Sequence, residues 1–340
     1  MARSEPGRRW DLPRDVGFDW TFLGSRRVSR GETHLYLTAP GISGAISTAD
    51  VVVIGGWESP ANWRIIRKAR RAGAAIILFY ESTQESHRFD SGLVAAKRRR
   101  VLQSVDVVLT VGPASRDAVI AEGVAPERVV MGRNSVDDEI VHEARRLRAQ
   151  RFATRDVGDA GTRESAMRYL FVGRLIKLKN VDGLLRAFAA VRQPAETLTI
   201  VGEGSEQDDL VRLADDLGLG EAVEFSGYRT GSELAAAYAQ ADCLVLPSST
   251  EVWGMVVQEA LDSGLSVVVS EHAGIVASLP PDAAVVVTPI ADAALGDALV
   301  AARTLTPTIA AGATDAGGEP LIEAILRAVA QALTMTSQAR

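Results

Sequence analysis

The sequence predicts an α/β fold with two Rossmann-like domains, each built on a parallel sheet. Short runs rich in Val, Ile and Leu recur along the 340 residues, and segments with helical spacing separate them. Near-continuous apolar strands that alternate with helices are typical of parallel sheets covered on both faces. At roughly 100–200 residues per domain, the length suits two domains. The predicted strands are residues 51–55, 75–80, 107–111, 169–172, 198–202, 223–226, 243–247 and 265–270.

The charge distribution and a polar segment divide the chain near its middle. Residues 1–150 hold 23 Lys and Arg against 18 Asp and Glu, whereas residues 151–340 hold 14 against 25. Opposite charge in the two halves indicates domains with different roles. We expect a first domain over residues 1–150, a linker over 151–168, a second domain over 169–318 and a final helix over 319–340 that packs back toward the first domain.

The composition excludes several classes of protein. The single cysteine, Cys243, excludes an internal disulfide framework and a metal site with several cysteine ligands. No apolar run approaches the roughly 20 residues that a membrane-spanning helix needs. The first residues, MARSEPGRRWDLPRD, lack the apolar segment of a signal peptide. We therefore expect a cytoplasmic protein without a metal site, and nothing in the pattern indicates a nucleic-acid partner.

The first candidate site is the loop 173–180, which follows the strand 169–172 and precedes a helix over 181–191. Ligands of open α/β sheets bind at the carboxyl ends of strands, and a following helix offers unpaired N–H groups to an anion. Lysine occurs only at positions 68, 97, 177 and 179, so two of the four lie in this loop. A compact ammonium charge suits phosphate binding. The alternative is a solvated surface loop.

The second candidate site lies in the segment 250–260, which follows the strand 243–247. Glu251 and Glu259 are eight positions apart, and we expect Gly254 to open a helix that leaves Glu251 in the loop. A phosphate would bind at the start of this helix, with one carboxylate on each side of it. Carboxylates also accept hydrogen bonds from paired sugar hydroxyls. The alternative is a solvated glutamate, but the apolar neighbours of Glu259 argue against an outer face.

A third strand end carries two glycines in the sequence Gly202-Glu203-Gly204-Ser205. Because a third glycine in register is missing, this is a poor dinucleotide fingerprint, and an NAD-dependent oxidoreductase is disfavoured. A tight turn between strand and helix is the alternative.

In these segments the sequence resembles the retaining GT-B glycosyltransferases of family 4, the glycosyl transferases group 1. The resemblance covers residues 170–280 and more loosely 50–137, including Asn134-Ser135-Val136-Asp137. The segment 244–261 contains the E-x7-E signature of the family, formed here by Glu251 and Glu259. The matching segments are FVGRL at 171–175, IVGEG at 200–204, EFSGY at 224–228 and LVLPSSTEVWGMVVQEAL at 244–261.

The resemblance implies metal-independent sugar transfer from a nucleotide-diphosphate sugar, a co-substrate rather than a cofactor, with retained anomeric configuration. Arg174 and Lys179 would neutralise the departing diphosphate, Glu251 would bind hydroxyls of the donor sugar, and Glu259 would hold the ribose hydroxyls. The other implied donor contacts are Gly173, Gly202, Tyr228, Arg229 and the amides of Gly254, Met255 and Val256. The acceptor would be a saccharide, a lipid-linked molecule or a small metabolite.

The sequence departs from the family on the acceptor side. Where the family commonly offers a histidine after a strand of the first domain, this chain has Glu81, which could orient the acceptor or stabilise an oxocarbenium ion. A helix N-cap or a turn residue is the alternative for Glu81. We expect the nearby His87 to be solvated, because its local context is polar. The Gly-Gly-x-Pro-Glu loop of the family is only partly present, at 272–275.

The first strand and glycine-rich loop of the family are not recognisable here, since the segment Asp50-Val51 comes some tens of residues early. We expect either a late annotated start or a natively shortened first domain. This departure and the missing histidine favour an alternative function, a non-catalytic nucleotide-sugar-binding partner subunit. A third possibility is an epimerase of the same fold.

Aromatic and basic residues of the first half suggest contacts beyond the donor. Trp57 and Trp63 could stack on acceptor sugars, with core packing as the alternative. The basic runs 64–71 and 97–100 could attract an anionic acceptor or the anionic inner face of a membrane, with a solvated helix face as the alternative. Nothing in the sequence indicates an oligomeric state.

Overall fold

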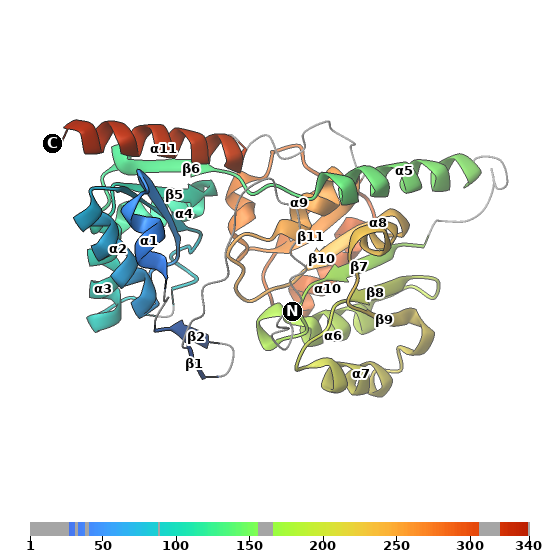
Figure 1. Cartoon of the computed structure of the whole chain (residues 1–340). Coiled ribbons are helices and arrows are strands. Elements are labelled where there is room, and N and C mark those ends of the chain that lie inside the picture. Colours follow the sequence, from blue (N-terminus) through green and yellow to red (C-terminus); the bar gives the residue numbers. More distant parts are fainter. Residues whose placement is uncertain are drawn as a thin grey trace. The chain divides into compact units, whose positions relative to one another are not determined.

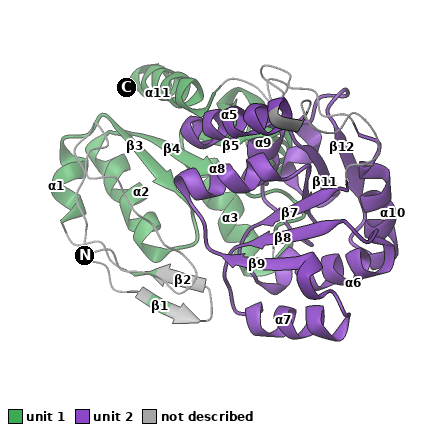
Figure 2. Cartoon of the chain, turned by 90° about the vertical axis from the view of Figure 1, so that its right-hand side faces the viewer, with its two compact units in different colours: residues 1–2, 10–134, 317–340 green, residues 3–9, 135–316 purple. Residues whose placement is uncertain are grey.

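The structure, a computed structural model, describes residues 27–30, 33–37, 41–87, 89–155, 166–305 and 320–338. The described residues fall into two compact units, one within residues 10–134 and 317–340 and the other within 135–316 (Figure 2). Each unit contains a fully parallel sheet, which confirms the predicted fold class. Most of the predicted linker over 151–168 lies outside the described residues, as do residues 306–319 before the final helix.

Unit 1 has a parallel sheet of four strands in the order β3-β4-β5-β6. Three of these strands coincide residue for residue with predicted ones. Their side chains are apolar on both faces, because helices cover each side (Figure 1). The strands are β3 (Val51–Gly55), β4 (Ala75–Tyr80), β5 (Val107–Val111) and β6 (Val129–Gly132).

One face of this sheet packs on the four helices that connect or precede its strands, and the other packs on the last helix of the chain. The strands follow one another in a single direction across the sheet, so right-handed crossovers place their connecting helices on the same face. A short antiparallel ribbon precedes them, formed by β1 (Arg27–Arg30) and β2 (Thr33–Tyr36). The helices are α1 (Ile42–Ser47), α2 (Pro60–Ala72), α3 (Gly92–Ser104), α4 (Gly112–Ala121) and α11 (Leu321–Gln338).

Helix α11 lies on the sheet of unit 1 through a stripe of fully buried alanines, Ala324, Ala328 and Ala332. Their spacing of four residues puts them on one side of the helix. Small side chains there let the helix approach β4 and β5 closely. The Arg327 side chain also donates to the carbonyl of Met131 at 3.1 Å. The final helix therefore completes the core of unit 1 from the far end of the chain.

Unit 2 has a parallel sheet of six strands in the order β12-β11-β10-β7-β8-β9. The chain starts at the centre with β7, runs outward through β8 and β9, and returns to the other side of β7 with β10. The strands are β7 (Arg168–Val172), β8 (Thr197–Val201), β9 (Val223–Gly227), β10 (Cys243–Leu246), β11 (Ser266–Ser270) and β12 (Val285–Thr288).

The helices of unit 2 are α5 (Asp138–Arg155), α6 (Val181–Val191), α7 (Gln207–Asp216), α8 (Gly231–Gln240), α9 (Met255–Asp262) and α10 (Asp292–Ala302). Short 3-10 turns add η1 (Pro126–Arg128) to unit 1 and η2 (Lys177–Lys179), η3 (Gly220–Ala222) and η4 (Gly274–Ser278) to unit 2. Helix α6 has the bounds that its apolar spacing predicts.

The division between the units falls after Asn134, whereas we expected the first domain to extend to residue 150. The physical reason lies in the arginines of α5. Arg148 and Arg151 donate to backbone carbonyls at the carboxyl end of α8, and Arg151 also pairs with Asp242 at 2.6 Å. Guanidinium groups stabilise the unpaired carbonyls of a helix end. These contacts attach the whole of α5 to unit 2.

The alanine stripe of α11 gives a test of how closely this helix packs. Substitution Ala328→Leu should lower the free energy of unfolding by about 1–3 kcal/mol, because the added side chain meets a packed sheet. Substitution Ala330→Leu, on the exposed side of the same helix, should change it by less than about 0.5 kcal/mol. Urea unfolding followed by circular dichroism measures both. Equal effects of the two substitutions would contradict the packing described here.

Candidate functional site

The reversal of strand order in unit 2 brings two predicted site loops together. Strands β7 and β10 are hydrogen-bonded neighbours, so the loops that follow them leave the same edge of the sheet side by side. The Lys179 ammonium forms an ion pair with the Glu251 carboxylate. The backbone N–H of Ser249 also donates to the carbonyl of Leu178 at 2.9 Å. Such a switch point is where open α/β sheets bind their ligands.

A third loop, after β8, joins this edge through backbone contacts. The N–H of Leu175 donates to the carbonyl of Glu203 at 2.9 Å, and the N–H of Glu206 donates to the carbonyl of Leu175 at 3.0 Å. Gly202 has φ +142°, and a Cβ there would overlap the carbonyl oxygen of Gly173. A Cβ at Gly204 would overlap the carbonyl of Leu175 in the same way. The two glycines therefore allow close backbone approach between loops.

The basic residues of the first loop are largely paired with carboxylates. Lys177 pairs with Glu206 and Lys179 pairs with Glu251, while the half-buried Arg174 lies between β7 and these lysines in sequence. Side-chain hydrogen bonding to Glu206 raises the pKa of Lys177. An anion that binds at this loop must therefore compete with carboxylates for both lysines.

Helix α9 begins at Met255, directly after Gly254, as the sequence predicts. Gly254 has φ +100°, a conformation that favours glycine, and this bend lets the loop turn into the helix. Its unpaired first amides face the edge from which the loop emerges. After the next strand, β11, the N–H of Gly274 at the start of η4 donates to the carbonyl of Glu251 at 3.0 Å, so the partly matching loop 272–275 supports Glu251.

Glu259 is half-buried rather than solvated. The Tyr238 hydroxyl of α8 donates to Glu259 Oε2 at 2.6 Å. Burial raises the pKa of the Glu259 carboxyl, the nearby Asp137 raises it further, and the hydrogen bond from Tyr238 opposes these effects. Burial also raises the pKa of Tyr238 well above its ordinary value. The Tyr238 hydroxyl thus orients the Glu259 carboxylate, and burial makes its ionised form less favourable than in water.

Buried polar atoms around α9 were not singled out by the sequence. The Ser248 hydroxyl, the Trp253 indole nitrogen and both amide atoms of Gln258 are buried and have no hydrogen-bond partner among the described residues. Unpaired buried polar atoms are uncommon, and those of native proteins often meet a ligand or a water molecule. The clearest signal in the sequence is Gln258, a polar residue between the apolar Val256-Val257 and the rest of the predicted helix.

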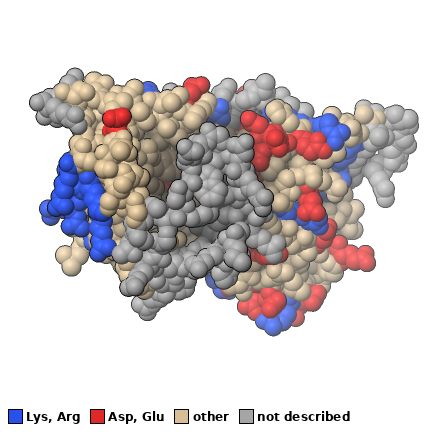
Figure 3. All heavy atoms as spheres, in the orientation of Figure 1, with Lys and Arg blue, Asp and Glu red and all other residues tan. Residues whose placement is uncertain are grey.

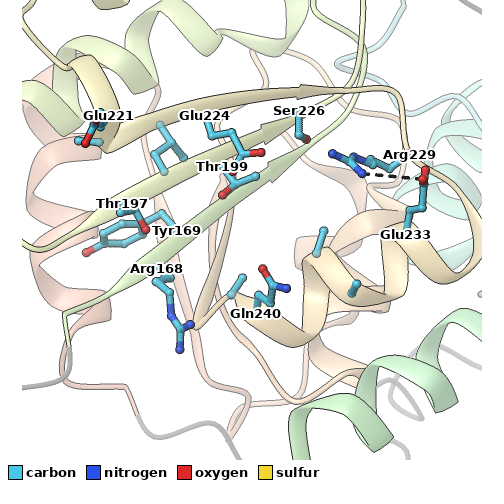
Figure 4. A pocket seen from close by; sticks show the side chains of 15 residues that line it. Arg168, Tyr169, Thr197, Thr199, Glu221, Glu224, Ser226, Arg229, Glu233 and Gln240 are labelled. Carbon is cyan, nitrogen blue, oxygen red and sulfur yellow. Dashed lines mark ion pairs between the residues drawn. The ribbon is translucent and has the colours of Figure 1, made fainter. Parts of the chain in front are cut away.

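Tyr228 and Arg229 follow β9 at the same edge of the sheet. Tyr228 is exposed, and Arg229 lies 3.9 Å from Glu233 of α8. Arg229 also lines a pocket of about 380 Å³ between α8 and the outer face of β8 and β9, where threonine, serine and glutamate side chains gather (Figure 4). Arg174, Lys179, Glu251 and Glu259 do not line this pocket.

In unit 1, Glu81 lies directly after β4, at the carboxyl edge of the sheet. The side-chain amide of Asn134 donates to Glu81 Oε1 at 3.3 Å. Glu81 is not an N-cap, because the next helix begins at Gly92. The contact joins two residues that the sequence places far apart, at the ends of β4 and β6.

The expectation of a solvated His87 is wrong. Its side chain is only 6% exposed, and its Nε2 lies 2.6 Å from the Tyr80 hydroxyl. Burial and the nearby Arg98 lower the pKa of His87, and Glu122 opposes them. Arg98 donates to Glu122 at 3.0 Å. Because these partners lie on other elements, the polar local sequence could not reveal them.

The described tryptophans of unit 1, Trp57 and Trp63, pack in or against its core. Trp57 is 8% exposed and packs in the cluster between β4 and the helices, so the stacking alternative does not hold for it. Trp63 packs partly against the same cluster and donates to the carbonyl of Trp57. The Lys97 ammonium lies 2.7 Å from the centre of the Trp63 ring.

Two negative findings hold for the part of the chain that the structure describes. No group of three or more His, Cys, Asp and Glu residues is arranged to hold a metal ion. Among the described helices, none combines the length and the apolar character that crossing a bilayer requires.

Because the first and third loops approach closely at Gly202, adding a single methyl group there should lower the stability of the protein strongly. Substitution Gly202→Ala should lower the free energy of unfolding by at least about 2 kcal/mol, because the backbone conformation and the carbonyl of Gly173 both oppose a side chain. Gly44→Ala, within α1 and with no atom near its Cβ, should be neutral or slightly stabilising. Thermal unfolding measures both. Equal melting temperatures would contradict the loop contact.

The half-buried Glu259 predicts that neutralising its carboxyl raises stability at high pH but not at low pH. Because its pKa is raised in the folded state, ionisation of this carboxyl costs stability as pH rises above the ordinary value of 4.5. Substitution Glu259→Gln, which still accepts from Tyr238, should raise the melting temperature at about pH 8 and have little effect at about pH 4. The exposed Glu224→Gln is the control. A destabilising effect of Glu259→Gln at high pH would refute the assignment.

Comparison with known proteins finds sequence similarity mainly in the second half of the chain. Residues 155–300 match the family described as Glycosyl transferases group 1. The D-inositol 3-phosphate glycosyltransferase of Salinispora arenicola is 38% identical over 39% of this chain and 32% of its own length. The enzyme of that name from Mycolicibacterium smegmatis is 32% identical over 58% of this chain and 53% of its own length. The chain thus spans about a third to a half of these two curated relatives.

Solved structures extend the likeness in fold to most of the chain. Anabaena Alr3699/HepE in complex with UDP has a TM-score of 0.60 at 19% identity, over 88% of this chain and 78% of its own. The lipopolysaccharide outer core galactosyltransferase WaaB has a TM-score of 0.64 at 15% identity, over 85% and 77%. Residues 155–300 are therefore similar to the family described as Glycosyl transferases group 1, and most of the chain shares the two-sheet α/β fold of solved GT-B glycosyltransferases.

Proposed function

We propose that this chain is a glycosyltransferase that moves a sugar from a nucleotide-diphosphate sugar to a hydroxyl acceptor, with retention of configuration and without a metal ion. One observation carries the proposal. The contact between Lys179 and Glu251 unites a cation for phosphate and a carboxylate for sugar hydroxyls at the switch point of the domain that matches the family.

The reaction needs positively charged or N–H groups that stabilise the negative charge on the diphosphate as its bond to the donor sugar breaks. Arg174 and Lys179 would stabilise the charge that develops on the departing diphosphate, together with the first amides of α9 at Gly254, Met255 and Val256. The bond from the anomeric carbon to the phosphate oxygen breaks, and a bond to the acceptor oxygen forms on the same face. The acceptor proton passes to the departing phosphate oxygen, so no protein base is required.

The rest of the donor would extend along the same edge of the sheet. Glu259, oriented by Tyr238, would accept hydrogen bonds from the ribose hydroxyls, and Glu251 would accept them from the donor sugar. The backbone near Tyr228 and Arg229 would meet the nucleobase, and Gly173 and Gly202 would border the diphosphate. The complex of the Anabaena protein with UDP supports a uridine nucleotide as the first candidate.

The acceptor is assigned to unit 1, where Glu81 and Asn134 meet at the carboxyl edge of the sheet. Glu81 would orient the acceptor hydroxyl or stabilise an oxocarbenium ion. The acceptor classes remain those of the family resemblance: a saccharide, a lipid-linked molecule or a small metabolite. Glu81 in place of the family histidine is also the observation that favours the second candidate function, a partner subunit that binds the donor without turnover.

Donor binding is tested first with UDP, GDP, ADP and dTDP, and then with sugars of the nucleotide that binds. A ligand at a hundredfold excess over its Kd adds about 2.7 kcal/mol to the free energy of unfolding, so a true donor should raise the melting temperature clearly. Turnover, read as nucleotide release with and without acceptors, excludes the partner-subunit alternative. A changed sugar formed without an acceptor would indicate an epimerase instead.

Two lysine substitutions in one loop distinguish a specific role of Lys179 in the reaction from a general effect of positive charge on the rate. Lys179→Ala should slow sugar transfer or donor hydrolysis by about 100- to 1000-fold, because the departing diphosphate loses a fixed cation. Lys177→Ala, two residues away on the exposed side of the loop, should stay close to the wild-type rate. Wild-type activity of Lys179→Ala within about threefold, under ~0.7 kcal/mol, would remove the basis of the proposal.

A further inference from the structure

The strongest charge on the surface of unit 1 lies on two neighbouring helices that contain no acidic residue. Helix α2 carries five Lys and Arg, and α3 carries four. Arg98 and Arg99 of α3 are paired with Glu122, and the other basic side chains of both helices are exposed. The space-filling view shows Lys and Arg gathered on one side of the molecule with few acidic atoms beside them (Figure 3).

The fold converts the two basic runs into one surface. On α2, Arg64, Arg67, Lys68 and Arg71 follow the spacing of a single helix face. On α3, Leu93, Ala96, Lys97 and Arg100 follow the same spacing, and all eight side chains are exposed.

Two contacts hold the helices side by side. The Lys97 ammonium of α3 lies over the Trp63 ring of α2, and Arg70 of α2 donates to the carbonyl of Ser104 at the end of α3. The two faces are therefore adjacent strips of one surface, the α2–α3 surface.

The amino end of α3 adds exposed apolar side chains to these cations. Leu93 is 90% exposed, Val94 is 41% exposed and Phe89, just before the helix, is 48% exposed. A leucine that is almost fully exposed beside these cations gains nothing from contact with water, whereas it would gain from contact with an apolar surface. Cations beside exposed apolar side chains are the combination that binds a lipid surface, where charge meets the headgroups and apolar side chains enter the acyl boundary.

We propose that the α2–α3 surface docks on an anionic lipid bilayer, with Leu93, Val94 and Phe89 inserted and the cations of α2 and α3 on the phosphates. A soluble polyanion such as nucleic acid would use the cations but gain little from the three apolar side chains. The loop from Glu81 to Phe89 joins β4 to α3, so docking brings the edge that carries Glu81 toward the bilayer. This inference does not depend on the proposed transferase activity.

The test is sedimentation of the full chain with vesicles of phosphatidylcholine alone or of equal parts phosphatidylcholine and phosphatidylglycerol. The wild-type chain should bind only the anionic vesicles, and less at about 0.5 M NaCl because salt screens the charges. Arg67→Glu with Arg71→Glu should weaken binding at least tenfold, since each cation near the surface contributes about 1 kcal/mol, which is about fivefold. Leu93→Ser with Val94→Ser should weaken it several-fold without changing the net charge.

The matched controls are Arg116→Glu on α4 and Arg212→Glu on α7, which remove exposed cations elsewhere and should leave vesicle binding within about twofold. Thermal unfolding of every variant checks that it is folded. Equal binding to neutral and anionic vesicles, or equal loss in the controls, would overturn the proposal. Binding of a DNA oligonucleotide that depends on Arg67 and Arg71, but not on Leu93 and Val94, together with no vesicle binding, would assign the surface to a polyanion and overturn it as well.

Discussion

The pairing of β10 with β7 is the constraint on which the candidate site depends. It reverses the direction of the sheet, so that two loops separated by three strands and three helices leave neighbouring positions on one edge. Without that reversal, Lys179 and Glu251 would lie at distant strand ends. The loop after β8 is then held against the first loop by backbone hydrogen bonds, and only glycine at 202 and 204 allows this approach. Three strand ends thus form one edge whose loops are held by hydrogen bonds, and fixed positions are what a site needs in order to stabilise a developing charge.

This edge carries several features that lower stability. Glu259 is half-buried beside Tyr238 and has a raised pKa, and buried polar atoms of Ser248, Trp253 and Gln258 have no hydrogen-bond partner among the described residues. A protein selected for stability alone would replace such groups with apolar side chains. Elsewhere in the described residues, buried charges such as Arg98 with Glu122, or Arg303 with Glu196, are paired, although one oxygen of Glu122 also lacks a hydrogen-bond partner. Under the proposed function, the buried polar atoms of Ser248, Trp253 and Gln258 would lie near the donor and could meet it.

The sequence predicted strands better than contacts. Buried parallel strands are apolar throughout, so β3, β4 and β5 could be located to the residue, and α6 and the start of α9 followed from spacing and from Gly254. The membership of α5 in unit 2 could not be predicted, because it rests on arginines that reach carbonyls of α8 about ninety residues away. The prediction that His87 is solvated was wrong for the same reason, since its local sequence is polar but its partners lie on other elements. The sequence predicted both Lys179 and Glu251 as site residues, but it could not predict that they form an ion pair.

The same contact changes the meaning of the charge distribution. The acid-rich half of the chain holds the predicted anion site, and its lysines there are already paired with Glu206 and Glu251. Under the proposed function, a diphosphate that takes Lys179 leaves the Glu251 carboxylate without its cation at the position where the donor sugar must be held. A carboxylate released in this way accepts hydrogen bonds from sugar hydroxyls more readily than one bound to an ammonium group. Phosphate binding and sugar binding are then coupled through one ion pair, and a nucleotide diphosphate without its sugar would leave Glu251 unpaired. Under the proposed function, the net charge of the half matters less to donor binding than these local pairs do, because the diphosphate would exchange partners with Glu251 rather than meet a positive surface.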